Sequence, residues 1–226
     1  MKLANRMFAI LLLVALSLSM VACAKVNVLG VSTPTTPLAV SDGSSVSDTE
    51  TPVSYRNDYF GYQCVLPDDW YVLNEDEIAQ MIGYTVDTLS ESDAGDVIQE
   101  TLDNGVSKMD FYAVAGDGLG NINIVLGKLK VIEMLLPLQQ LLDASSEVLV
   151  SGLESMGATN VSTSTEKIDF LGEERLALLV QGEYTGATIY ETIVVVRDGM
   201  YNFSVTMTSF GQDASQDMAA YFHPID

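Results

Sequence analysis

Acidic and aromatic side chains gather in one short stretch of this sequence. Seven of them lie between positions 68 and 77: Asp68, Asp69, Trp70, Tyr71, Glu75, Asp76 and Glu77. Carboxylates near a loop can supply several of the oxygen ligands that Ca²⁺ takes, and aromatic rings can form the floor of a groove for a small ligand. The stretch is therefore a candidate surface for a ligand or a protein partner.

The spacing of these acids leaves their chemistry open. Glu91, Asp93 and Asp96 follow, yet the sequence has no Asp-x-Asp-x-Asp-Gly calcium loop, and a charge run is more often a solvated face. Two acids facing each other across a cleft would instead suit a glycosidase. Trp70 either fills the core edge beside the first helix or forms the floor of a groove with Tyr71 and Tyr84.

Side chains that usually carry nucleophilic or acid–base chemistry are scarce. The chain has one histidine, His223, and two cysteines, Cys23 and Cys64. Cys64 lies on an apolar strand face without a neighbouring cation to lower the pKa of its thiol, so we expect a buried core residue. His223 is expected on the surface near a fraying end. We therefore predict no catalytic residue, no metal site and no cofactor.

The glycine-rich stretch Gly116-x-Gly118-x-Gly120 is superficially similar to a dinucleotide-binding loop. Such a loop must open a helix, because the helix N–H groups bind the pyrophosphate. Here Ile122, Ile124 and Leu126 occupy alternate positions directly after the glycines. This pattern predicts a strand, so we interpret the glycines as the turn of a hairpin.

Composition excludes several classes of protein. The 226 residues include 31 acidic and 10 basic side chains, for a net charge of −21, which argues against nucleic-acid binding. Hydrophobic residues make up 48% of the chain, too many for wholesale disorder and enough for one buried core. An acidic surface of this kind would favour a basic protein partner.

Residues 1–22 have the features of a signal peptide. Two basic residues precede an uncharged, mostly apolar run from Met7 to Met20, which is shorter than the roughly 20 residues of a membrane span. Ala22 directly before Cys23 resembles a bacterial lipobox. The resemblance implies cleavage before Cys23 and a diacylglycerol on its sulfur; an ordinary secretory signal cut near Ala22 or Ala24 is the alternative.

Cleavage before Cys23 removes two basic residues and no acid, so the mature net charge is −23. Anionic lipid headgroups repel such an acidic chain. The diacylglycerol attached to Cys23 must therefore hold the protein at the membrane. Residues 23–54 are rich in Ser, Thr and Pro and predict a disordered tether with a reach of about 30 Å. The prediction is a lipid-anchored protein on the extracytoplasmic face of the cell membrane.

Residues 55–226 are predicted to form one α+β domain with an antiparallel sheet. Alternation predicts strands at 60–66 continued by 70–73, then 109–113, 122–126, 162–170, 175–184, 187–197 and 200–209. Helices are expected at 74–82 with Asn74 as N-cap, 93–102, 136–156 and 213–222. Strand 187–197 is apolar on much of both faces, so it should lie centrally.

Five short motifs follow one another along this domain. They are Asn57-Asp58-Tyr59-Phe60-Gly61-Tyr62, Leu66-Pro67-Asp68-Asp69-Trp70, Phe170-Leu171-Gly172, Tyr184-Thr185-Gly186 and Arg197-Asp198-Gly199-Met200-Tyr201. The pattern resembles small lipoproteins of Gram-positive bacteria with a Mog1/PsbP-like domain. That resemblance implies an antiparallel sheet sandwiched between helices. The better-known members of that fold are non-enzymatic, one binding a small GTPase and another serving photosystem II, but a shared fold does not transfer function.

Three functions remain open at this point. The first is a non-catalytic lipoprotein that holds an acidic domain outside the membrane for contact with a protein. The second is a module that binds a small ligand or Ca²⁺ around residues 68–77. The third is a hydrolase that acts on cell-wall glycans through carboxylates.

Overall fold

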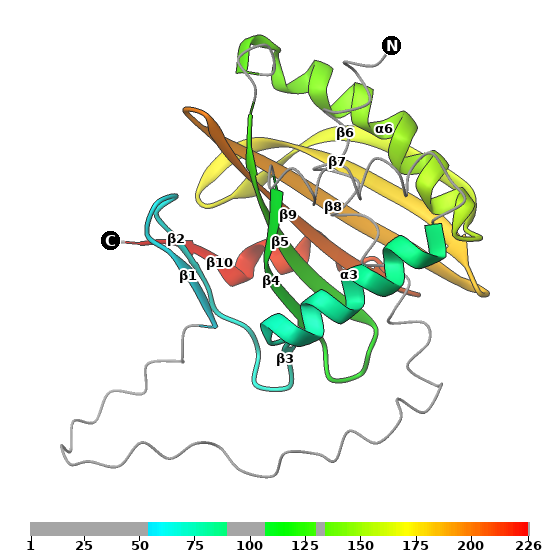
Figure 1. Ribbon diagram of the computed structural model, residues 1–226. Coiled ribbons are helices and arrows are strands. Elements are labelled where there is room, and N and C mark those ends of the chain that lie inside the picture. The colour runs from blue at the N-terminus through cyan, green and yellow to red at the C-terminus, as the bar shows by residue number, and fades with distance from the viewer. Residues whose placement is uncertain (1–53, 90–106, 130–133, 226) are drawn as a thin grey trace, which may run out of the picture.

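The computed structural model describes residues 54–89, 107–129 and 134–225 (Figure 1), without the side chains of 83–89. The predicted signal peptide, Cys23, the tether up to residue 53 and the helix at 93–102 lie outside the described residues. The same holds for Glu91, Asp93, Asp96 and the side chain of Tyr84.

A seven-stranded antiparallel sheet forms the centre of the domain. In spatial order its strands are β3 (Tyr71–Val72), β4 (Ser107–Val114), β5 (Gly120–Lys128), β9 (Tyr201–Phe210), β8 (Ala187–Asp198), β7 (Glu173–Tyr184) and β6 (Thr159–Phe170). Strand β8 is an interior strand between β9 and β7, with a long buried run. The α+β class, the antiparallel sheet and the interior position of β8 are confirmed.

Two helices pack on one side of this sheet, which we call the helix face (Figure 1). They are α3 (Glu75–Leu89) and α6 (Leu138–Ser155). Leu142, Leu149 and Leu153 recur at helical spacing on α6, so one stripe of the helix is apolar and packs onto the sheet. Pro137 directly precedes α6, where its missing N–H leaves no helical hydrogen bond unmade.

A small three-stranded sheet and a short helix cover the opposite side, which we call the small-sheet face. The strands are β1 (Tyr55–Asn57), β2 (Tyr62–Cys64) and β10 (Phe222–Pro224), in the order β1-β2-β10, and the 3₁₀ helix is η2 (Asp217–Tyr221). Tyr62, Cys64 and Phe222 are buried against the apolar residues of β5 and β9. This side therefore carries a second core.

The single strand predicted over 60–66 and 70–73 is wrong. The chain forms β2 and β3, which belong to different sheets, and β2 pairs instead with β1 through a turn at Asn57–Gly61. Gly61 has a φ of +68°, a conformation that glycine adopts without strain. Pro67 follows β2, and its carbonyl accepts a hydrogen bond from the Trp70 N–H (3.1 Å) in a second turn that redirects the chain.

The final helix predicted at 213–222 is also wrong in type and extent. Only Asp217–Tyr221 is helical, as one short 3₁₀ segment, and Phe222 then enters strand β10 opposite Cys64. Pairing with β2 places the Phe222 ring in the second core, whereas a continued helix would be stopped by Pro224. His223 is exposed, as predicted, but pairs with Gln63 in that strand.

The glycine-rich turn does join two strands, so the hairpin interpretation is confirmed. Gly116 is required there because a Cβ atom at this position would lie 2.5 Å from the carbonyl oxygen of Asp69. The β8–β9 hairpin is confirmed with a turn one residue later than expected. Asp198 pairs with Tyr201, which leaves Gly199, with φ of +56°, and Met200 in the turn.

Candidate functional site

The predicted acidic surface lies around the start of α3. One of its carboxylates, Glu77, takes part in capping that helix. The Asn74 side chain accepts a hydrogen bond from the Glu77 N–H (3.0 Å), and Glu77 Oε2 accepts one from the Asn74 N–H (2.8 Å). This reciprocal pair is a capping box, so the predicted N-cap is confirmed. Glu77 Oε1 accepts a bond from the Tyr71 hydroxyl (2.6 Å). Both oxygens of Glu77 therefore serve the local structure.

The remaining members of this surface do not converge on one point. Asp68, Asp69, Glu75 and Asp76 are exposed. Trp70 is half-buried and packs edge-to-face on Tyr221 of η2, with ring centroids 5.8 Å apart, so it lies on the small-sheet face and not beside α3 as expected. Within the described ranges, no three His, Cys, Asp or Glu side chains are close enough to hold a metal ion.

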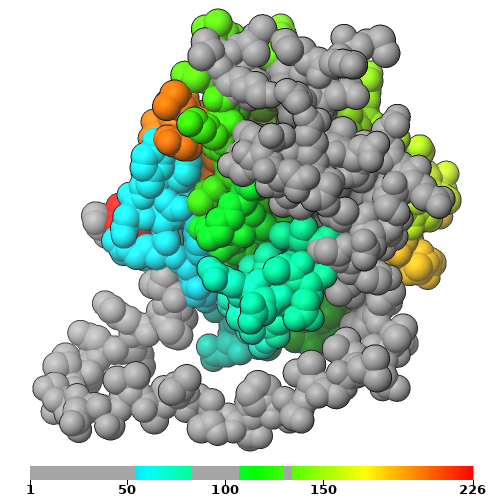
Figure 2. Space-filling view, viewed as in Figure 1, coloured from blue at the N-terminus to red at the C-terminus, as the bar shows by residue number. Residues whose placement is uncertain are grey.

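An aromatic groove lies elsewhere, between the β1–β2 turn and the adjoining ends of β5 and β9. It encloses about 290 Å³ and is lined by Asn57, Tyr59, Phe60, Leu126, Gly127, Tyr201 and Asn202. Figure 2 shows the cyan β1–β2 hairpin bordering the orange surface near residue 200. The groove thus joins the first hairpin of the domain, which ends at Cys64, to strands that begin at Gly120 and Tyr201.

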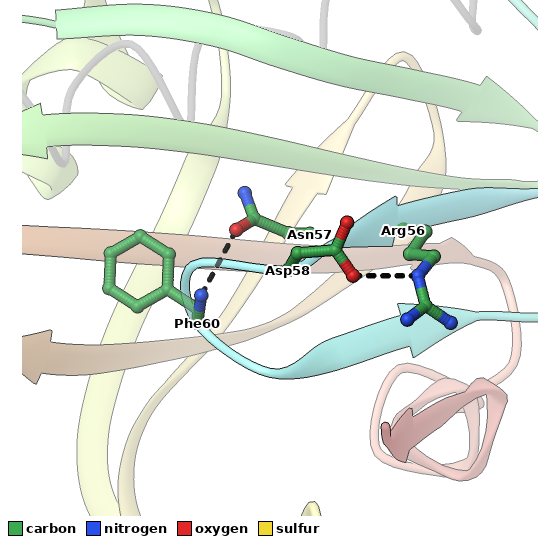
Figure 3. Close-up of polar contacts among 4 residues, drawn as sticks. All are labelled: Arg56, Asn57, Asp58 and Phe60. Carbon is green, nitrogen blue, oxygen red and sulfur yellow. Dashed lines mark hydrogen bonds and ion pairs between the residues drawn. The ribbon is translucent and has the colours of Figure 1, made fainter. Parts of the chain in front are cut away.

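Two polar contacts fix the turn that forms one wall of this groove (Figure 3). Asn57 Oδ1 accepts a hydrogen bond from the Phe60 N–H (3.1 Å), and the Arg56 guanidinium pairs with Asp58 (2.8 Å). The ion pair is exposed and contributes about 0–1 kcal/mol, so the Asn57 bond is the more important of the two. The turn therefore presents Tyr59 and Phe60 in a defined position.

A chain of ring contacts connects the groove to the core. Tyr59 is 59% exposed and meets Tyr201, 40% exposed, edge-to-face with centroids 5.5 Å apart. Phe60 packs edge-to-face on the buried Phe203 at 4.7 Å, and Phe203 stacks on Tyr62 at 4.4 Å. The exposed rings are thus supported by rigid neighbours. Rigid, partly exposed aromatic side chains are typical of protein-binding surfaces.

The outer hydroxyl of the groove belongs to Tyr59 and is protonated at neutral pH, as in any ordinary tyrosine. Local desolvation, with smaller contributions from the Asp198 carboxylate and Tyr201, raises the pKa of the Tyr59 hydroxyl. Since the ordinary pKa of tyrosine is about 10, this group is a hydrogen-bond donor at neutral pH. A partner that inserts an apolar group into the groove can therefore accept a hydrogen bond at its rim.

The groove residues are not among the site residues predicted from the sequence, although the sequence contains a pattern that points to them. Tyr59, Phe60 and Tyr201 all belong to the motifs that carry the family resemblance. Tyr59 and Phe60 lie in a turn, where polar residues usually prevail, and Tyr201 directly follows one. Aromatic side chains at such positions indicate a surface with a purpose other than chain reversal. What the sequence could not show is that the β1–β2 turn meets the ends of β5 and β9.

Two further reactive groups, the Cys64 thiol and the Glu191 carboxyl, are buried in the domain. Cys64 is buried as predicted, and burial raises the pKa of its thiol to about 12, so it stays an inert thiol at neutral pH. Glu191 is 1% exposed in the middle of the helix face, and burial raises the pKa of its carboxyl to about 8. Thr208 donates a hydrogen bond to Glu191 Oε1 (3.2 Å).

Comparison with known proteins gives only weak structural likenesses. No family model matches this chain, and no curated protein matches it. Among solved structures, a Bacteroides thetaiotaomicron protein is 12% identical over 74% of this chain, with a TM-score of 0.39. The chain spans 46% of the length of that protein. At such values the likeness carries no function over.

Two further structures are similar at the same low level. LpqN of Mycobacterium tuberculosis, involved in cell envelope biogenesis, is 13% identical over 73% of this chain and 83% of its own, with a TM-score of 0.40. A Pseudomonas aeruginosa protein of unknown function is 13% identical over 45% of this chain and 67% of its own, with a TM-score of 0.30. The Mog1/PsbP-like resemblance stays a prediction.

Among the described residues, no helix combines the length and the apolar composition needed to cross a bilayer.

Proposed function

We propose that this protein is a non-catalytic, lipid-anchored accessory domain on the extracytoplasmic face of the cell membrane, which binds a protein partner through its aromatic groove. The observation that carries the proposal is the pair of exposed rings, Tyr59 and Tyr201, held edge-to-face over a buried aromatic stack. Burial of solvent-exposed rings of this kind by a partner contributes strongly to the free energy of binding.

The partner's chemistry follows from the surroundings of the groove. Its floor is apolar, with Phe60 and Leu126, while the chain as a whole carries a net charge of −21. An apolar or aromatic side chain of the partner would fill the groove, and the net negative charge of the whole chain would favour a basic partner at long range. Binding should therefore weaken as salt is added.

The anchor part of the proposal rests on the sequence. Ala22-Cys23 follows the apolar run of residues 7–20, and the stretch at 23–54 lacks large apolar side chains in its Ser/Thr/Pro-rich segments. A lipid on Cys23 and a flexible tether would hold the domain close to the membrane and let it turn toward a partner. Replacing Cys23 with Ala should move the protein out of the membrane fraction of cells.

The docking part is tested by crosslinking in intact cells that produce the full chain. The double variant Tyr59→Ser/Tyr201→Ser removes both exposed rings of the groove. Tyr71→Ser is the matched control, since Tyr71 is equally a surface tyrosine, 51% exposed, but lies outside the groove. We expect one partner to be recovered with the native chain and with the control, and to be lost with the double variant.

Two outcomes contradict this function. Equal recovery of the partner with the groove variant would place the contact elsewhere on the surface. Recovery of no specific partner by a native chain that does reach the membrane would remove the protein-binding role altogether. Circular dichroism of each variant shows that loss of the partner does not reflect loss of the fold.

The calcium-binding alternative has less support from the geometry. Glu77 is occupied by its hydrogen bonds to Tyr71 and Asn74, and the other acids of the 68–77 surface are exposed. Calcium requires about six to eight oxygen ligands arranged around one point. A calcium titration that raises the unfolding temperature of the full chain would restore this alternative.

A further inference from the structure

A polar hollow lies on the small-sheet face of the large sheet, away from the aromatic groove. It encloses about 310 Å³, at the lower end of the range for small-ligand pockets. Side chains from β6, β7 and β8 and from the segment after β9 line it; the groups that matter below are Ser162, Glu166, Gln181, Tyr190, Asp213 and Gln216. The hollow shares no lining residue with the groove or with the 68–77 surface.

Strand register places the floor of the hollow on one face. Ser162 pairs with Gln181, Gln181 with Tyr190, and Tyr190 with Ser209, so these four residues form a continuous polar row across β6, β7, β8 and β9. Cross-strand partners share a face of the sheet. The row therefore presents hydroxyl and amide groups side by side at one end of an otherwise apolar face.

The opposite rim of the hollow is held rigidly by hydrogen bonds. The Ala214 N–H donates to Ser209 Oγ (3.0 Å), which ties the segment after β9 back to the polar row. The buried hydroxyls of Thr192 and Ser215 are 2.9 Å apart, and Ser215 donates to Asp213 Oδ1 (3.1 Å). Because Ser215 has one hydrogen, Thr192 must donate to Ser215. This relay points the Asp213 carboxylate in a fixed direction and leaves its second oxygen available.

The charges of the hollow define the ligand class. None of its lining residues is Lys, Arg or His, while Glu166 and Asp213 supply carboxylates, so an anionic ligand is excluded. Gln181 and Gln216 offer amide donors, and within the described part of the chain no side-chain hydrogen bond engages either of them. A ligand that fits must both donate to carboxylates and accept from amides. Neighbouring hydroxyl groups on a ring do this.

We propose that this hollow is a binding site for a neutral saccharide of one or two rings. The sugar hydroxyls donate to Asp213 and Glu166 and accept from Gln181, while one face of the ring packs against Tyr190. The half-buried Tyr190 ring supplies the apolar surface that the C–H groups of a sugar ring require. The site is independent of the protein-binding role proposed for the groove.

The test measures binding of glucose, N-acetylglucosamine, cellobiose and chitobiose to the full chain by saturation-transfer NMR and calorimetry. We expect at least one of these sugars to bind with a Kd near about 1 mM, as suits an open hollow. Gln181→Ala and Asp213→Asn should each weaken binding about fivefold, since each removes or reduces one hydrogen bond. Thr165→Ala is the control, on β6 but outside the hollow.

Three results overturn the proposal. Absence of binding by all four sugars at concentrations well above 1 mM would exclude the site. Unchanged binding in both hollow variants would place the sugar elsewhere. Glucosamine or Ca²⁺ bound much more tightly than glucose, and lost in Asp213→Asn, would show that the carboxylates select a cation. Unfolding curves of each variant show whether a loss of binding comes from the site or from the fold.

Discussion

The two faces of the large sheet differ sharply at its centre. On the small-sheet face, β5 and β9 contribute Ile122, Ile124, Phe203, Val205 and Met207, all fully buried in an apolar core. On the helix face, the intervening residues of the same strands and their neighbour on β8 are polar yet just as buried: Asn121, Asn123, Glu191, Ser204, Thr206 and Thr208. One pair of strands therefore carries two unlike interiors.

The polar interior is under-satisfied. Both amide atoms of Asn121, the hydroxyls of Ser204 and Thr206, and Glu191 Oε2 have no hydrogen-bond partner in the described part of the chain. A buried polar atom without a partner costs about 1–3 kcal/mol. At the sheet centre, we therefore expect the small-sheet face to contribute more to stability than the helix face. Glu191, whose carboxyl pKa is raised by burial to about 8, lies on the same side.

The largest effect is expected from Phe203, at the centre of the apolar face. Phe203→Ala removes a ring that contacts both Phe60 and Tyr62, and it should lower the free energy of unfolding by about 3–5 kcal/mol. Urea denaturation followed by circular dichroism measures this value. A loss below 1 kcal/mol would show that the apolar face does not carry the fold. Ser204→Ala, on the helix face, is the matched control and should not destabilise the domain, because the hydroxyl that it removes has no partner in the described part of the chain.

Glu191 gives the next largest effect, which depends on pH. Its native pKa of about 8 lies above the ordinary value of 4.5, so between these pH values the folded state holds a proton that the unfolded state releases. Stability of the native chain should thus fall by up to about 1.4 kcal/mol per pH unit in this window. The contribution of Glu191 to the free energy of unfolding should be most favourable below pH 4.5 and should stop changing above pH 8.

The variant Glu191→Gln keeps the shape of the side chain and removes the titration. We expect its stability to lose most of this slope between pH 5 and 8 and to exceed that of the native chain by about 3 kcal/mol at pH 7. Denaturation curves at several pH values compare the two proteins. Parallel pH profiles would mean that the Glu191 carboxyl ionises in the folded state without penalty.

A smaller effect tests the two faces with adjacent residues. Thr206→Val replaces a hydroxyl that lacks a partner and should raise stability by up to about 1 kcal/mol. Val205→Thr is its mirror image on the apolar face, where the new hydroxyl should cost about 1–3 kcal/mol. Changes of the same sign in the two variants would contradict the contrast between the faces.

The smallest effect is expected at the N-terminus of α3, one of the two helices that pack on the helix face. Asn74→Ala removes the cap of α3 and should destabilise the domain by about 1 kcal/mol. Glu77→Gln keeps an oxygen that can accept the Asn74 N–H and is the matched control. If both variants equal the native chain in urea, α3 contributes little to the folded state.

The alternation along β9 predicted both faces correctly but not their burial. Tyr201, Phe203 and Val205 alternate with Asn202, Ser204 and Thr206, a pattern normally typical of a strand with one face in water. Whether helices cover the polar face is decided by segments distant in the sequence. Burial of Glu191 has a local signal: it is the one acid within the long apolar run of β8.

The errors at the two ends of the domain have a common physical cause. Strands β1, β2 and β10 have three residues each, too few for an alternating pattern to be recognised. They exist because pairing buries Tyr62, Cys64 and Phe222, which is a property of the tertiary structure. The aromatic groove was missed for the same reason, since it forms where the β1–β2 turn meets β9.

The central claim, that a protein partner occupies the aromatic groove, is tested most directly by photo-crosslinking in intact cells. A photoreactive phenylalanine replaces Tyr59 in one chain and Tyr71, exposed but outside the groove, in another. We expect a discrete crosslinked species from position 59 that is absent from position 71 and is reduced in high salt. No crosslink from position 59, or the same product from both positions, would contradict it.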